Sequence, residues 1–289
     1  MEAQQKFASY LEQYDKNDDK IRLKAVHTFG VVQAAGYIAA DLGLSPQDQK
    51  LAATIALLHD IGRFEQLRRY HTFDDAVMPH AQCSIQILFR DGMIREFEED
   101  RSLDSIIYNA IRLHGVYRLP KEGYRHYVWP REPLAQGSWE SWEEQLEEEA
   151  DPAERERILL HTKIIRDADK VDNFRVKAEE PVETMVDVSA RQLGREAITQ
   201  DIFDTFMRHT PILNSNRKTH MDMWVSYFGY LFDFNFASGL KYIQEKQYVE
   251  AMADRIVYTN LDTAEKMRLI RSEALSYIEK RIKGRVDET

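Results

Sequence analysis

The segment SPQDQKLAATIALLHDIG, residues 45–62, contains the clearest secondary-structure signals in the chain. Ser45 can cap a helix, and the proline that follows it suits a first helical turn. An apolar run comes next, and Gly62 is typical of a helix exit. The pattern therefore predicts a mostly buried helix with His59 and Asp60 in its last turn.

Apolar side chains recur with a 3.6-residue spacing on both sides of this segment. Prolines and glycines are few, 8 and 12 in 289 residues, so little interrupts the spacing. The chain is therefore expected to be all-α. Further helices are predicted at about 21–41, 79–90, 103–114, 151–172, 190–208, 220–253 (broken near 236–239) and 263–283, with a long loop at 117–138 and an acidic connector at 140–151.

The helical spacing weakens after Pro181. Polar and apolar residues alternate over 182–188, which leaves a short strand or an extended link open there. We expect two domains, a core over residues 1–180 and a helical C-terminal extension over 181–289 that packs on it.

Composition excludes several classes of partner. The chain has 39 basic and 49 acidic side chains, whereas nucleic-acid binding needs clustered excess positive charge. No apolar run approaches the roughly 20 residues of a membrane span. Cys83 is the single cysteine, so neither an internal disulfide nor a cysteine-rich zinc site is expected. These features indicate a cytoplasmic protein without nucleic acid or membrane partners, and they leave a homo-oligomer open.

Four of the nine histidines lie on, or at the ends of, predicted helices: His27, His59, His80 and His114. A buried imidazole needs either a hydrogen bond or a metal ion. Any one of them alone is explained by a bond to a carbonyl group. Four together, with Asp60 and a buried Asp169, form a ligand set for divalent ions in the absence of thiolates.

Five sequence blocks in a fixed order resemble the HD superfamily of metal-dependent phosphohydrolases. The blocks are His27, HDIGRFEQ at 59–66, Pro79-His80-Ala81, Arg112-Leu113-His114-Gly115, and RDADKVD at 166–172. Their order, H…HD…H…H…D, is the six-ligand version of the pattern, which holds two metals in this superfamily. The resemblance covers about residues 20–175 and implies that the core is an HD-domain catalytic core.

The resemblance implies which residues bind metal. One ion is assigned to His27, His59, Asp60 and Asp169. Asp60 then bridges to a second ion held by His80 and His114. The expected cofactor is a pair of divalent transition metals, with Fe, Mn, Zn, Ni and Co as candidates and Mg also compatible.

Such metals favour hydrolysis of phosphate esters. A divalent ion lowers the pKa of bound water from about 15.7 toward about 7–9, so a metal-bound hydroxide exists near neutral pH. Phosphoryl transfer also needs fixed cations, and Arg63, three residues after Asp60, is the leading candidate. The predicted function is a metal-dependent phosphohydrolase that acts on a small phosphorylated molecule, with nucleotides among the candidates. Asp60 and Arg63 are its predicted catalytic residues.

Further side chains are candidates for substrate binding because they lie near these blocks or in the loop after His114. With Arg63, the set comprises Arg69, His71, Arg166, Tyr117 and Arg118. For each of them a surface or structural role is the ordinary alternative. Lys163 and Lys170 are expected to face solvent.

Two other functions stay open at this point. Some superfamily members, such as myo-inositol oxygenase and related phosphonate oxygenases, place two irons on the same ligand pattern and activate oxygen, and imidazole and carboxylate ligands suit iron equally. A regulatory module that binds a nucleotide without turnover is the other alternative.

Overall fold

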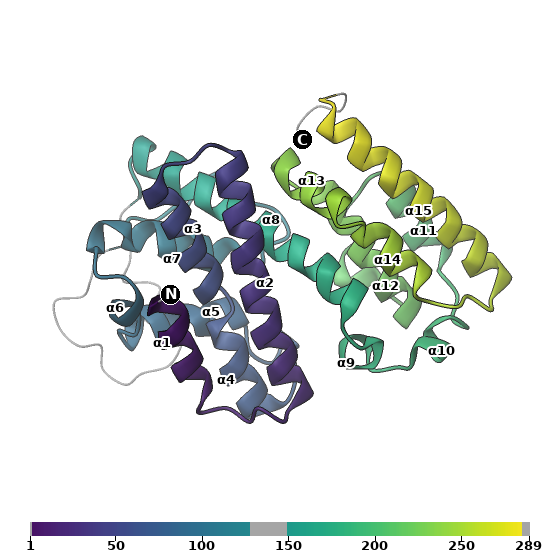
Figure 1. Ribbon diagram of the computed structural model, residues 1–289, viewed down its shortest axis with the longest axis horizontal. Helices are drawn as coiled ribbons and strands as arrows, with labels where there is room; N and C mark the ends of the chain where they lie inside the picture. Colours follow the sequence, from purple (N-terminus) through teal and green to yellow (C-terminus); the bar gives the residue numbers. More distant parts are fainter. Residues whose placement is uncertain (1, 128–148, 285–289) are drawn as a thin grey trace. The chain divides into compact units, whose positions relative to one another are not determined.

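The computed structural model describes residues 2–127 and 149–284, and it is all-α, as the sequence predicts (Figure 1). Within these ranges the β pairing is a single isolated bridge between Arg125 and Glu149. The predicted acidic connector and the second half of the predicted 117–138 loop lie largely outside the described residues. No helix in the described ranges is long and apolar enough to cross a membrane.

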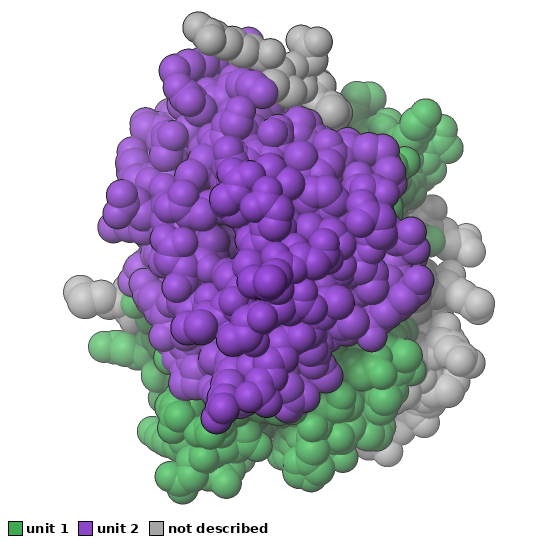
Figure 2. Space-filling view, turned by 90° about the vertical axis from the view of Figure 1, so that its right-hand side faces the viewer, with its two compact units in different colours: residues 1–32, 45–166 green, residues 33–44, 167–289 purple. Residues whose placement is uncertain are grey.

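The chain forms two compact units, which Figure 2 shows in different colours. Unit 1 comprises residues 1–32 and 45–166, and unit 2 comprises residues 33–44 and 167–289. Helices α2 (Asp19–Asp41) and α8 (Pro152–Glu179) each contribute residues to both units. The division between the two units thus falls inside α8. The predicted domain boundary, at residue 180, lies just after the end of that helix and stays a prediction.

Unit 1 contains the first four of the five sequence blocks, from His27 to Gly115. Besides parts of α2 and α8, it comprises α1 (Glu2–Leu11), α3 (Pro46–Leu58), α4 (Ile61–Tyr70), α5 (His80–Ile85), the π-helix η1 (Gln86–Arg90), α6 (Ile94–Phe97), the 3-10 helix η2 (Arg101–Leu103) and α7 (Asp104–Leu113).

Helix α3 begins as the sequence predicts. The Asp48 backbone N–H donates to Ser45 Oγ at 3.1 Å, which satisfies one of the unpaired donors of the first turn. The predicted exit at Gly62 is wrong, because α3 ends at Leu58 and α4 begins at Ile61, with Asp60 as its N-cap residue. The break therefore falls at the His59–Asp60 pair itself.

Gly62 instead allows α4 and α5 to pack closely. A Cβ atom at this position would lie 2.5 Å from Ser84 N and 2.6 Å from His80 O, closer than atoms can approach. Two hydrogen bonds hold the junction: Gly62 N–H donates to Ser84 Oγ at 2.9 Å, and that hydroxyl donates to His59 O at 3.0 Å. This contact places His80 of α5 beside the break between α3 and α4.

Unit 2 is built from shorter helices. They are α9 (Val182–Val186), α10 (Ala190–Leu193), α11 (Gln200–Met207), the 3-10 helix η4 (Asn214–Asn216), α12 (His220–Phe228), the 3-10 helix η5 (Gly229–Asp233), α13 (Ala237–Glu245), α14 (Tyr248–Asp254) and α15 (Leu261–Ile282).

Three details of unit 2 differ from the sequence predictions. The alternating segment 182–188 forms a short helix rather than a strand. The helix predicted over 190–208 is interrupted between Leu193 and Gln200, and the one predicted over 220–253 is divided into several short helices. Helix α15 packs against α11, α13 and α14, so the short helices share one long partner.

Candidate metal centre

Five of the six predicted ligands come together in unit 1. His27 lies on α2, His59 and Asp60 form the break between α3 and α4, His80 begins α5, and His114 follows the last residue of α7. All five side chains are buried. They form two groups that share Asp60: His27, His59 and Asp60, which we call the first group, and Asp60, His80 and His114, the second group.

Each oxygen of Asp60 faces one group. Oδ2 lies 3.5 Å from His59 Nε2 and 4.0 Å from His27 Nε2. Oδ1 lies 3.5 Å from His80 Nε2 and 3.7 Å from His114 Nε2. These separations are longer than those of ordinary hydrogen bonds. A carboxylate between two sets of imidazoles can bridge two cations.

The hydrogen bonds of the imidazoles indicate their tautomers. The Nδ1 atoms of His59 and His114 lie 2.7 Å from the carbonyl oxygens of Ala56 and Ile111, which only accept hydrogen bonds. Each Nδ1 therefore carries a proton in the neutral ring, and each Nε2 presents a lone pair. His80 Nδ1 similarly faces Asp75 Oδ1 at 2.7 Å.

In the second group, His80 Nε2 and His114 Nε2 are only 3.0 Å apart. With both Nδ1 atoms protonated, two lone pairs face one another beside the Asp60 carboxylate. That arrangement is electrostatically unfavourable alone, and a cation held by these two imidazoles would relieve it. The neutral imidazoles and the carboxylate fit divalent transition metals, and neither group includes a thiol.

The electrostatics keep Asp60 and His80 in their metal-binding forms. Burial raises the pKa of Asp60, but the charge of Lys24 and the neighbouring histidines lower it more, so the pKa lies well below its ordinary value. Burial, followed by the charge of Arg63, lowers the pKa of His80 to about 4. At neutral pH the carboxylate is therefore ionised and this imidazole is neutral.

Asp75 connects His80 to Arg63. The Arg63 guanidinium donates to Asp75 Oδ1 at 2.7 Å and to the Phe73 carbonyl oxygen at 2.8 Å, while its Nε lies 3.7 Å from Asp60 Oδ1. Arg63 thus lies beside the second group, with much of its charge offset by Asp75. Its catalytic and substrate-binding roles stay predictions.

Replacing Asp75 with asparagine is expected to weaken metal binding at the second group by about 10–100-fold, because the hydrogen-bonded carboxylate orients His80 and increases its basicity. Metal titration of the purified variant measures this. Asp74→Asn, which changes an exposed neighbour in the same segment, is the matched control. Equal metal affinity in the two variants would show that Asp75 does not support His80.

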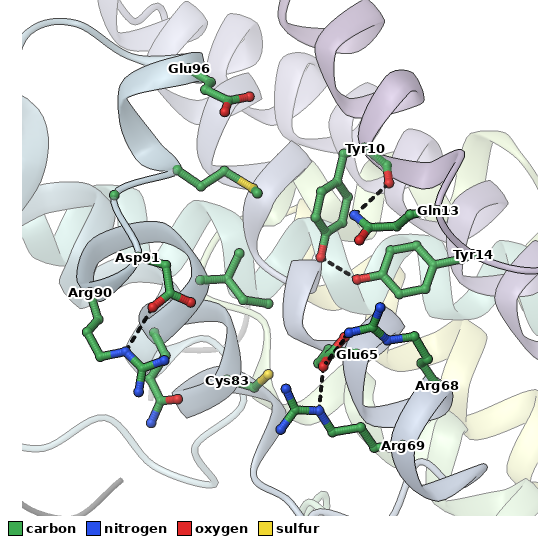
Figure 3. A pocket seen from close by; sticks show the side chains of 14 residues that line it. Tyr10, Gln13, Tyr14, Glu65, Arg68, Arg69, Cys83, Arg90, Asp91 and Glu96 are labelled. Atoms are coloured by element: carbon green, nitrogen blue, oxygen red, sulfur yellow. Dashed lines mark hydrogen bonds and ion pairs between the residues drawn. The ribbon is translucent and has the colours of Figure 1, made fainter. Parts of the chain in front are cut away.

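Arg69 and His71 lie toward the end of α4. Figure 3 shows Arg69 and Arg68 at the carboxylate of Glu65, at the wall of a cavity of about 550 Å³ that is also lined by Tyr10. His71 is exposed and ends α4 in a left-handed conformation, with φ of 53°. Arg69 is therefore ion-paired at a cavity that none of the five metal-site residues lines.

Arg166 is buried, and its guanidinium donates to backbone carbonyl groups at the end of α7, including His114 O at 3.1 Å. These bonds satisfy helix-end acceptors and hold the segment that carries His114. Tyr117 and Arg118, just beyond, are exposed, and the Arg118 guanidinium lies 5.6 Å from the Tyr117 ring centroid. Substrate binding by these three residues stays a prediction.

Six of the seven residues of the 166–172 block, all except Arg166, belong to unit 2. Asp169, the sixth predicted ligand, accepts a hydrogen bond from Asn173 Nδ2 at 2.9 Å, and its metal-binding role stays a prediction. The expectation that Lys170 faces solvent is wrong, because this side chain is buried and pairs with Asp233 at 2.9 Å.

Two further residues lie at this site outside the predicted set, Lys24 and Asp75. Lys24 Nζ lies 2.6 Å from Asp60 Oδ2, closer than either histidine of the first group. The signal for Lys24 is its place one turn before His27, which puts both on one helix face. Asp75 has no comparable signal, because the loop that carries it has no regular period.

Comparison with protein-family models matches the HD domain over residues 25–173, slightly more than half of the chain. The chain belongs to the HD domain family, and all five clustered ligands fall within the matched range. No curated protein and no solved structure matches the chain. The family, the helical fold and the histidine–aspartate groups together indicate a member of the metal-dependent phosphohydrolase superfamily.

Proposed function

We propose that this protein is a metal-dependent phosphohydrolase that acts on a small phosphorylated molecule. The observation that supports the proposal best is the position of Asp60, with one carboxylate oxygen toward each pair of imidazoles. Such an arrangement suits two cations that share one carboxylate, and paired cations are a recurrent device for displacement at phosphorus.

Bound divalent ions would lower the pKa of a water ligand and polarise a phosphoryl oxygen. The histidines of both groups would hold these ions through Nε2. The carbonyl groups of Ala56 and Ile111 and the carboxylate of Asp75 would fix the Nδ1 protons of His59, His114 and His80, in that order. Arg63 and Lys24 border the carboxylate and supply positive charge for the oxygens of a phosphoryl group.

A panel of phosphate esters tests the proposal. The protein is stripped of metal with a chelator and reloaded separately with Mn, Co, Ni, Fe, Zn or Mg, and released inorganic phosphate is measured. We expect release only after reloading. Oxygen consumption with iron and no phosphate release would instead support the oxygenase, and ligand binding without turnover under every metal would support a binding module; either outcome contradicts the proposal.

A further inference from the structure

Phe73 lies between α4 and α5, and three cationic side chains surround its ring. Lys20 Nζ, Lys24 Nζ and the Arg63 guanidinium carbon lie 5.9, 5.6 and 5.9 Å from the ring centroid. We call these four residues the cationic rim. Each distance is within the range of cation–π attraction, but three like charges around one ring also repel one another. Nearby anions therefore stabilise this arrangement.

Two carboxylates of unit 1 offset the repulsion among these three cations. Asp75 pairs with Arg63 at 2.7 Å, and Asp60 Oδ2 pairs with Lys24 at 2.6 Å. Asp60 is also the carboxylate that both metal groups share. Cations bound in these groups would neutralise the charge of Asp60. The Lys24 ammonium would then lie beside the metal centre with its carboxylate partner already engaged by the ions.

The two lysines extend from the metal centre in a row. Lys20, Lys24 and His27 stand at i, i+4 and i+7 on α2, so they share one face of that helix. The Lys24 side chain is only 18% exposed, and Lys20 is half-buried. The row therefore continues from a metal ligand to two cations at successive helical turns, a spacing that suits an elongated anion.

We propose that the cationic rim binds a substrate with two neighbouring phosphate groups, with the reacting phosphoryl group at Lys24 and the second phosphate at Lys20. The proposal rests on the proposed hydrolase function and narrows its substrate to phosphoanhydrides and closely spaced bisphosphates. Arg63, held by Asp75, forms the third side of the rim. Simple monoesters engage only the Lys24 end.

Two non-hydrolysable probes test this: methylphosphonate, which has one anionic group, and methylenediphosphonate, which has two. Binding to metal-loaded protein is measured by calorimetry at a fixed free metal concentration. We expect the diphosphonate to bind at least about tenfold more tightly, because hydrogen bonds to charged groups typically contribute this much or more. Lys20→Met should abolish that advantage, and Lys24→Met should weaken both probes at least about tenfold.

Lys50→Met is the matched control, because the Lys50 side chain is 74% exposed on α3 and should leave both affinities unchanged. Metal content is measured for every sample after the titration. We expect the lysine variants to retain their metal, which separates loss of anion binding from loss of the ions.

Equal affinity of the wild-type protein for the two probes would overturn the inference, as would a diphosphonate advantage that persists in Lys20→Met, or absence of binding by both probes. These outcomes are distinguishable from failure of the proposed function. If one of these binding results occurs and the protein still releases phosphate in a metal-dependent way, the proposed hydrolase function stands. Only the proposal that the cationic rim binds two phosphate groups is then rejected.

Discussion

Asp60→Asn is expected to reduce metal-dependent phosphate release by at least about a thousandfold and to weaken metal binding at both groups together. The substitution preserves the shape of the side chain but removes the charge that both groups share. Stabilisation of the transition state by bound ions amounts to several kcal/mol, and each 1.36 kcal/mol corresponds to a factor of ten in rate. Initial rates and metal titrations of the purified variant measure the two effects.

Asp74→Asn, at an exposed carboxylate outside both groups, should keep wild-type activity and metal content. Circular dichroism should show the same helix content in both variants. An Asp60→Asn protein that is folded and retains most of its phosphate release would reject the assignment of Asp60 as the shared ligand.

Gly62→Ala is expected to lower the free energy of unfolding by about 3 kcal/mol and Tm by about 5–10 °C. The added methyl group meets backbone atoms, Ser84 N and His80 O, which cannot move aside as a flexible side chain can. Thermal denaturation followed by circular dichroism measures the shift. Because His80 lies at this contact, metal binding at the second group should weaken as well.

Gly36→Ala on α2 is the corresponding control, because nothing lies within 4 Å of its added Cβ and alanine favours a helix. It should leave Tm unchanged or raise it. A Gly62→Ala protein as stable as the control variant would contradict this prediction, because it would show that α4 and α5 can move apart without loss of stability.

Much of the fold can be predicted from local signals. The Ser45 cap and the apolar spacing after it are enough to place α3, because both act within a few residues. The break at His59–Asp60 is not predictable in this way. It depends on the approach of α5, which contacts Gly62 through residues 80–84. The helix at 182–186 is not predictable from local signals either, because five residues are too few to distinguish helical from alternating periodicity.

The candidate site, like the fold, can be predicted from the sequence only in part. The five clustered ligands fall within sequence blocks whose order is distinctive, so they could be named before the structure. The partners of these ligands could not, because Asp75 reaches His80 from an irregular loop. Lys170 illustrates the same limit: its burial depends on Asp233, 63 residues later in the chain, and no local pattern signals that pairing.

Crystals of the metal-loaded protein and of His114→Ala, examined by anomalous scattering, test the shared-carboxylate arrangement most directly. We expect two ions in the wild-type protein, one at His27 and His59 and one at His80 and His114, both in contact with Asp60. In His114→Ala we expect the ion of the first group to remain and that of the second to be lost. Ions located away from Asp60, or equal loss of both ions in the variant, would contradict the account.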